Sequence, residues 1–290
     1  MTAPLGKLDQ AESVSGAPAR RRLRWHADLI APAILGLVVL AVICAPLVAP
    51  YDPYAQDLLH MLEPPSAGHW FGTDILGRYV LSRVIWGGWP PLIVGVGSVI
   101  IATAFGTFCG IVAGFRGGAF DGVVSRIADI QMSIPGLVLA LLVLALFGSA
   151  ITNLIFIIAI ESWPLHFRVV RSHVRSVRAL AYVEAAELAG QGAPRILRRH
   201  VLPSTLPLLA VTATVNFSTA VLAEAGLSFL GLGIQPPTAD WGMMVSEGQT
   251  QLGAAWWVSV FPGLALLVVL LCAQIIGDTL SRRTSVRADG

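Results

Sequence analysis

Long uncharged stretches alternate along the chain with shorter segments that carry most of its charges. A helix that crosses a membrane needs roughly 20 mainly apolar residues. The uncharged run from Ile130 to Ile160 is too long for one such helix, and Phe147-Gly148-Ser149 supplies a break within it. The pattern predicts six spanning helices, near residues 29–50, 90–114, 127–147, 151–170, 204–231 and 257–277.

The distribution of basic residues predicts the orientation of these helices, because cytoplasmic segments beside spanning helices carry an excess of Lys and Arg. With the N-terminus inside, only Arg78 and Arg83 of the 19 Lys and Arg residues lie on the outer side. We therefore expect an N-in, C-in topology. It divides the chain into a cytoplasmic tail, a first span, an outer segment with a short helix, a block of five spans and a second tail, at residues 1–28, 29–50, 51–87, 88–281 and 282–290.

The composition indicates a membrane protein, and the sequence lacks the motif that binds nucleotide phosphates. Charged residues make up only 12% of the chain, against about 25% in soluble domains, which favours an all-α integral membrane protein. The three cysteines are far apart and suggest neither a disulfide framework nor a metal site. Lys7, the only lysine, is followed by Leu8, so the phosphate-binding loop G-x-x-x-x-G-K-[ST] is absent. We expect no enzyme activity, no cofactor held by this chain and no nucleic-acid partner.

Two features inside the predicted spans go beyond hydrophobicity. Acidic residues within a membrane are costly and are candidate functional residues. Glu161 lies in mid-span and is a candidate for a water-filled pathway or for a buried hydrogen bond, whereas the structural role is favoured for Glu224. Small residues at four-residue spacing in the second span predict a ridge on which another helix packs closely: Ala102, Gly106, Gly110 and Gly114.

The outer segment is long and carries four acidic residues, Asp52, Asp57, Glu63 and Asp74. Thr73 or Asp74 can cap a short helix that runs through Trp86. Apolar positions along this helix would make it amphipathic, so we expect it to lie at the membrane interface.

The stretch YVEAAELAGQGAPRILRRHVLP, residues 182–203, differs from the apolar runs on both sides. Its beginning is rich in helix formers, Gly190 can end that helix, and Pro194 can begin another. The predicted cytoplasmic loop over residues 172–203 therefore contains two short helices separated by a glycine turn. A basic helix lying on lipid headgroups is the alternative, but the alanines of this stretch offer little apolar area to a membrane.

This stretch resembles the EAA signature of permease subunits in binding-protein-dependent ABC importers. The match comprises Glu184-Ala185-Ala186, then Gly190 and, at the expected distance, Leu202-Pro203. Other stretches resemble the C-type permease of dipeptide and oligopeptide importers: residues 69–83, with Thr73, Asp74, Gly77 and Arg78, residues 223–233, and Gln235-Pro236-Pro237 with Trp241-Gly242. The resemblance covers roughly residues 25 to 283, and it departs from the usual signature at His200, Ser204 and Gly192-Ala193-Pro194.

The resemblance implies a function and a set of partners. In that family the EAA loop forms a coupling helix that docks on a separate ATPase, and the outer segment lies near the mouth of the pathway, where a solute-binding protein docks. The expected partners are a homologous B-type permease, two ATPase subunits or one two-domain ATPase that bind ATP and Mg²⁺, the solute-binding protein and membrane lipid. The implied substrates are small peptides, and the implied location is the bacterial inner membrane. The residues implied in the ATPase contact are Glu184, Ala185, Ala186, Gly190, Leu202 and Pro203.

Three alternatives stay open at this point. Within the same group, nickel complexes or haem are alternative substrates, because the binding protein largely selects the solute. An ion-coupled secondary transporter would use intramembrane acids such as Glu161 or Glu224, although the sequence shows no convincing inverted repeat. A non-transporting assembly or receptor protein is a third class, against which the EAA loop argues.

Overall fold

The computed structural model describes the chain from residue 17 to residue 288, and its side chains from residue 28 to residue 282. Residues 1–16 and 289–290, which belong to the two expected tails, lie outside the described residues. Within the described range the fold is helical, and extended pairing is limited to an isolated bridge between Thr73 and Tyr79.

The helices differ widely in length. The longer ones are α1 Ala17–Ile43, α4 Trp89–Arg116, α5 Gly118–Met132, α6 Gly136–Phe147, α7 Ile151–Arg178, α10 Leu202–Phe229 and α12 Trp257–Ala288. The shorter ones are α2 Ala45–Val48, η1 Leu58–His60, α3 Val80–Trp86, α8 Ala181–Leu188, α9 Ala193–Ile196, the π-helical turn η2 Leu197–Val201 and α11 Trp241–Gln249.

Length and composition identify four candidate membrane spans in the described residues, or five if α5 and α6 together form one. The first expected span, 29–50, corresponds to a shorter apolar helix, Asp28–Ile43, followed by α2. Six spans therefore stay a prediction. The four candidates are Val80–Arg116, Ile151–Arg178, Ala193–Phe229 and Trp257–Arg282.

The expectation of one continuous helix near residues 127–147 is wrong. Here α5 and α6 meet at an angle of 87°. The cause is Pro135, which disfavours a helical conformation at Ile134 and has no N–H to donate to the preceding turn. The break is held against α7, because the indole Nε1 of Trp163 donates to the side-chain oxygen of Gln131 at 2.8 Å.

The ridge of small residues in α4 faces α7. Ala102 is fully buried, and a Cβ atom added to Gly106, Gly110 or Gly114 would lie 2.7–2.8 Å from a Cβ atom of α7. Real Cβ atoms do not approach this closely, so the glycines allow the two backbones to come together. The helix that packs on the ridge is therefore in this chain.

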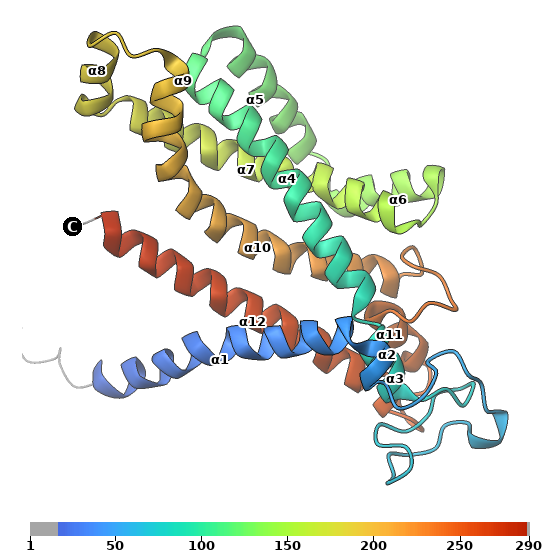
Figure 1. Cartoon of the computed structure of the whole chain (residues 1–290). Helices are drawn as coiled ribbons and strands as arrows, with labels where there is room; N and C mark the ends of the chain where they lie inside the picture. The colour runs from blue at the N-terminus through green and yellow to red at the C-terminus, as the bar shows by residue number, and fades with distance from the viewer. Residues whose placement is uncertain (1–16, 289–290) are drawn as a thin grey trace, which may run out of the picture.

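Figure 1 shows that the short elements gather at two opposite ends of the long helices. α8, α9 and the C-terminal end of α12 lie at one end, which we call the α8 end. Residues 51–79, α3 and α11 lie at the other, the α11 end. There α11 packs tightly between two long helices: a Cβ atom on Gly242 would lie 2.2 Å from the Ala225 carbonyl of α10, and one on Gly248 would lie 2.4 Å from Ser259 Oγ of α12.

Candidate functional site

The EAA stretch forms α8, a short helix with a well-defined end. Gly190 follows this helix with φ 78°, a left-handed conformation that favours glycine. Its N–H donates to the Glu187 carbonyl at 3.0 Å, and the N–H of Gln191 donates to the Ala186 carbonyl at 3.1 Å. These are the paired bonds of a Schellman cap, so Gly190 sets the direction in which the chain leaves α8.

α8 has one face buried within the chain and one face exposed. Glu184 and Ala185 are exposed, and Leu188 is 85% exposed. Val183 and Ala186 are buried, in a cluster with Val170, Val174, Val177, Ile196, Val201 and Leu209. The Glu-Ala-Ala triplet is thus divided: Ala186 anchors the helix to its own chain, whereas Glu184 and Ala185 lie on the free face.

Arg178, at the end of α7, connects α8 to α4. Its guanidinium donates to the Phe115 carbonyl and lies 5.0 Å from the centre of the Phe115 ring. Its Nε atom lies 3.5 Å from the Glu187 carboxylate of α8. An exposed pair of this kind contributes little stability by itself. Arg178 instead helps to position α8, because its side chain joins α7, to which it belongs, to both α4 and α8.

α10 begins at Leu202-Pro203, directly after η2. Pro203 lies in the first turn of α10, but the helix is continuous from Ala193 through η2, so its missing N–H interrupts the backbone hydrogen bonding beside the π-helical turn. Beside this start, exposed arginines line a hollow of about 570 Å³ together with Pro194. These arginines are Arg195, Arg198 and Arg199. Within residues 28–282, no carboxylate forms an ion pair with any of the three.

Two of the positions that depart from the EAA signature make contacts within the chain. The hydroxyl of Ser204 lies 3.1 Å from His173 Nε2, which joins the foot of α10 to α7. The His200 ring lies 5.3 Å from the Tyr182 ring, which joins η2 to α8. Both contacts help to position the segment of residues 179–203, which contains α8, α9 and η2.

Four charged side chains form a largely buried cluster at the α11 end, which we call the ionic cluster. The Nε atom of Arg78 and the Nη1 atom of Arg83 each lie 2.6 Å from Asp74 Oδ2. The Oε2 atom of Glu247 lies 3.3 Å from Arg78 and 2.9 Å from Arg83. Two positive and two negative charges therefore balance, which is what buried ions require. Because Glu247 belongs to α11, the cluster joins the outer segment to that helix.

The expected capping of a helix by Thr73 or Asp74 is wrong, because α3 begins only at Val80. The Oδ1 atom of Asp74 instead accepts from the N–H groups of Leu76 and Arg78, each at 2.9 Å. A carboxylate that accepts from nearby backbone N–H groups stabilises a turn as readily as a helix start.

Thr73 and Gly77 complete this turn. Gly77 has φ 70°, and a Cβ atom added to it would lie 1.8 Å from the Asp57 carbonyl oxygen, so only glycine fits. The Thr73 hydroxyl donates to the His60 carbonyl at 2.5 Å, and the Thr73 carbonyl accepts from Trp257 Nε1 at 3.0 Å. The turn is therefore bound both to the outer segment and to α12.

Glu224 is fully buried near the end of α10. Its Oε1 atom accepts from the Ser228 hydroxyl at 2.9 Å, and Asp240 is its acidic neighbour. Asp240 is itself buried, caps α11 by accepting from the Met243 N–H at 2.9 Å, and has a pKa raised by burial. Glu224 thus lies where α10 and α11 pack together, not on an open surface.

Glu161 is exposed and lies beside the break between α5 and α6. A Cβ atom added to Gly136, the first residue of α6, would lie 1.8 Å from a carboxylate oxygen of Glu161. A negative charge is favourable near the first turn of a helix. Glu161, which is predicted to lie in mid-span, is therefore next to the break between α5 and α6.

Sequence reasoning missed Glu247 and Asp240. Asp240 could have been found, because Asp directly before a helix is a common cap. Glu247 carries no local signal, since its partners lie far away in the sequence.

Comparisons with known proteins identify the class that this arrangement defines. The family described as "Binding-protein-dependent transport system inner membrane component" matches residues 106–286. A second family, "N-terminal TM domain of oligopeptide transport permease C", matches residues 20–65. The chain belongs to the binding-protein-dependent transport permease family, and it is a multi-pass protein of the bacterial inner membrane.

Several curated relatives are similar over most of their length. The chain is 38% identical to the probable D,D-dipeptide transport system permease protein DdpC of Escherichia coli, with 89% of this chain and 86% of that protein covered. It is 40% identical to the di/tripeptide transport system permease protein DppC of Pseudomonas aeruginosa, with 84% and 82% covered. It is also 38% identical to the glutathione transport system permease protein GsiD of Escherichia coli, with 96% and 92% covered.

A solved structure shares the fold. It is an inward-facing form of the MetNI methionine ABC transporter, and it matches 70% of this chain and 97% of its own chain with a TM-score of 0.55 at 21% identity.

Proposed function

We propose that this chain is a permease subunit of an ATP-driven importer of small peptides. It lines the pathway together with a second, homologous permease. Separate ATPase subunits bind ATP and Mg²⁺ and dock on the exposed face of α8, and a solute-binding protein delivers the peptide at the α11 end. Support for the substrate class comes from the relatives, whose names describe peptide, dipeptide and glutathione permeases.

The division of α8 into an anchored and a free face carries the proposal. A coupling helix has to bind a partner on one side and move the long helices with the other. Ala185 and Leu188 are exposed and uncharged, while Val183 and Ala186 are buried in a cluster with side chains of α7 and α9. A displacement of α8 would therefore move α7 and α10 as a rigid body, which is a common way to transmit a conformational change.

The experiment changes α8 and its cap without touching the long helices. Ala185→Asp places charge on the free face, and Gly190→Val places a β-branched residue at a left-handed φ. Gly190→Asn is the matched control, since Asn tolerates this conformation. Ala119→Asp repeats the first substitution at an exposed alanine of α5, outside residues 179–203.

The readouts are subunit stoichiometry of the purified complex, ATP hydrolysis stimulated by the binding protein, and peptide uptake into proteoliposomes. Ala185→Asp and Gly190→Val should lose ATPase association or stimulated hydrolysis, and the two controls should keep both. Wild-type behaviour of all four variants would show that α8 is not the coupling element. Uptake driven by an ion gradient without ATP would instead favour a secondary transporter, and a nickel complex or haem that co-purifies with the binding protein would change the substrate class.

A further inference from the structure

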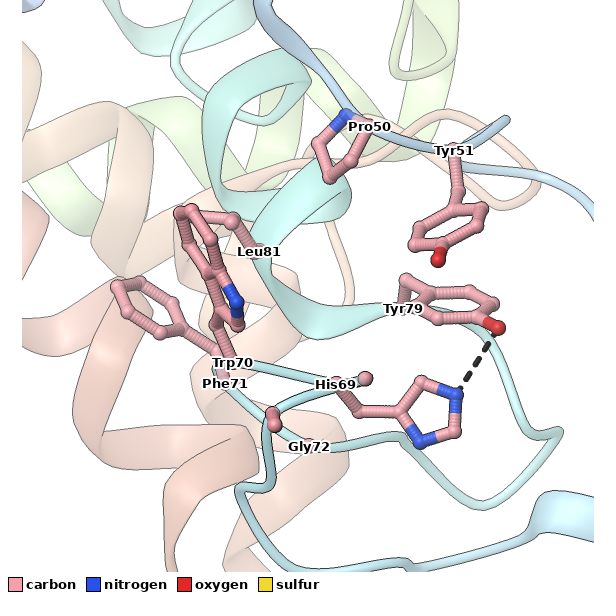
Figure 2. Close-up of a pocket in the computed structure, with 10 residues that line it drawn as sticks. Pro50, Tyr51, His69, Trp70, Phe71, Gly72, Tyr79 and Leu81 are labelled. Carbon is pink, nitrogen blue, oxygen red and sulfur yellow. Dashed lines mark hydrogen bonds between the residues drawn. The ribbon is translucent and has the colours of Figure 1, made fainter.

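The outer segment contains a pocket of about 270 Å³ with largely aromatic walls (Figure 2). Tyr51 and Tyr79 stack with ring centroids 3.9 Å apart and form one wall, and Trp70 and Leu81 form another. Pockets for whole small molecules usually measure about 300–1,000 Å³. This smaller volume suits a single long side chain better than a complete solute.

The pocket is built into the fold. The Nε2 atom of His69 lies 2.9 Å from the Tyr79 hydroxyl, and its Nδ1 atom lies 3.0 Å from the Glu63 carboxylate. With the proton on Nδ1, His69 donates to Glu63 and accepts from Tyr79, so both ring nitrogens of His69 and the Tyr79 hydroxyl have partners. Next to it, Phe71 stacks on Phe261 of α12 with centroids 3.9 Å apart, which fixes the pocket to a long helix.

Trp70 is the exception to this packing. Trp70 lines the pocket, yet it is 71% exposed. A large exposed indole beside a hollow is a common anchor point in protein interfaces, where Trp contributes more binding energy than most residues.

Fixed charge around the pocket is negative. The only Lys or Arg residue between positions 51 and 79 is Arg78, which is buried and paired with Asp74. Asp52 is exposed, and Asp57 and Glu63 are partly exposed. Asp57 lies 2.8 Å from His60, and Glu63 lies 3.0 Å from His69. The pKa of Tyr79 is raised, first by burial and then by the neighbouring Tyr51, Asp57 and Glu63.

We propose that this pocket receives a lysine or arginine side chain of the solute-binding protein, an inference that rests on the proposed function. The aliphatic stem of such a side chain packs on Trp70 and Leu81. Its cationic group lies over the aromatic faces and close to Glu63, which combines cation–π attraction with a salt bridge. The location suits this partner, since the pocket is at the end of the molecule opposite α8 (Figure 1).

The first test measures the affinity of the purified, solute-loaded binding protein for the complete transporter in nanodiscs of phosphatidylethanolamine and phosphatidylglycerol. Trp70→Ala removes the exposed wall, and Glu63→Gln removes the charge while keeping the shape. Each should weaken binding by about fivefold or more. Tyr54→Ala is the control, because this tyrosine is 42% exposed in the same segment but does not line the pocket. It should stay within about twofold of wild type, as expected for a surface residue.

Charge complementarity adds a second readout. Binding should weaken as salt is raised, and Glu63→Gln should show a smaller salt dependence than wild type. Unchanged affinity in both pocket variants would overturn the pocket proposal alone. A wild-type complex that the binding protein neither binds nor stimulates would overturn the proposed function, and this inference with it.

Cross-linking identifies the occupant. A photoreactive benzophenone side chain placed at position 70 should cross-link to a peptide of the binding protein that contains a surface Lys or Arg. Reversing the charge of that residue should weaken binding to the wild-type transporter, and Glu63→Lys should recover part of the loss. A cross-link only to phospholipid would show that Trp70 is a membrane anchor and would overturn the proposal.

Discussion

The Arg83 guanidinium of α3 lies 2.9 Å from the Glu247 carboxylate of α11, although 164 positions separate the two residues in the sequence. The same guanidinium nitrogen lies 2.6 Å from Asp74 in the outer segment. Only 2% of the Arg83 side chain and 1% of that of Asp74 are exposed. The ionic cluster therefore fastens the outer segment to α11, which itself packs between α10 and α12.

Asp74→Asn should destabilise this attachment strongly. Two arginines would then share Glu247 as their only carboxylate in the cluster, and removing one partner from a buried pair costs about 3–5 kcal/mol. Asp52→Asn is the control, since Asp52 is exposed and accepts only a local bond from the Tyr54 N–H; its cost should stay near 1 kcal/mol or below. Thermal unfolding of the purified protein and protease cleavage of the outer segment measure both changes. Equal stability of the two variants would show that the cluster does not hold the segment.

The ridge on α4 predicts a contrast between two glycine-to-alanine changes. In Gly110→Ala the new Cβ atom would lie 2.8 Å from Val170 Cβ and 2.9 Å from the Phe167 carbonyl. Backbone atoms cannot move aside as flexible side chains do, so α4 and α7 must separate, at a cost of about 1–3 kcal/mol.

Gly122→Ala, in α5, is the matched control, because nothing lies within 4 Å of its added Cβ atom. Alanine has the higher helix propensity, so this variant should be neutral or up to about 1 kcal/mol more stable. Thermal unfolding in the same detergent compares the two. A loss of stability in Gly122→Ala as large as that in Gly110→Ala would mean that general helix effects, not the ridge, determine the result.

Local patterns predicted well those features that depend on nearby residues. The four-residue spacing of small side chains indicated the ridge, and the glycine in the EAA stretch indicated the end of α8. Both depend on the periodicity of one helix or on one backbone conformation, which the sequence displays directly.

Features that depend on distant residues or on competing signals were missed. The pairing of Arg83 with Glu247 joins segments far apart in the chain, and no local pattern marks it. In the predicted third span, hydrophobicity suggested continuity while Pro135 required a break, and the proline prevailed. Thr73 and Asp74 were read as a helix cap, although the same side-chain chemistry also stabilises the turn that the structure contains.

Glu161→Gln should leave assembly intact and alter transport. The carboxylate lies at the start of α6, beside the break that interrupts the predicted membrane region, and a charge there is better tolerated next to a wet cavity than next to lipid. The neutral amide keeps the shape and removes only the charge. Membrane abundance and uptake kinetics are measured together, and unchanged kinetics at normal abundance would remove Glu161 from the pathway.

Single cysteines can test the predicted orientation, in which both termini and α8 face the cytoplasm while the outer segment faces outward. The prediction depends on the basic residues, since only Arg78 and Arg83 lie on the outer side of this arrangement. Asp57 and Trp241 are predicted to face outward and Glu184 inward, but Trp241 is 1% exposed and would not react.

Leu59→Cys and Leu188→Cys are better probes, because these side chains are 90% and 85% exposed at opposite ends of the molecule. In a background without Cys44, Cys109 and Cys272, an impermeant thiol reagent added to intact spheroplasts should label position 59 and not position 188. Lysis should then expose position 188. Labelling of position 188 before lysis would contradict the predicted topology. It would show that α8 lies on the outer side, out of reach of any cytoplasmic ATPase.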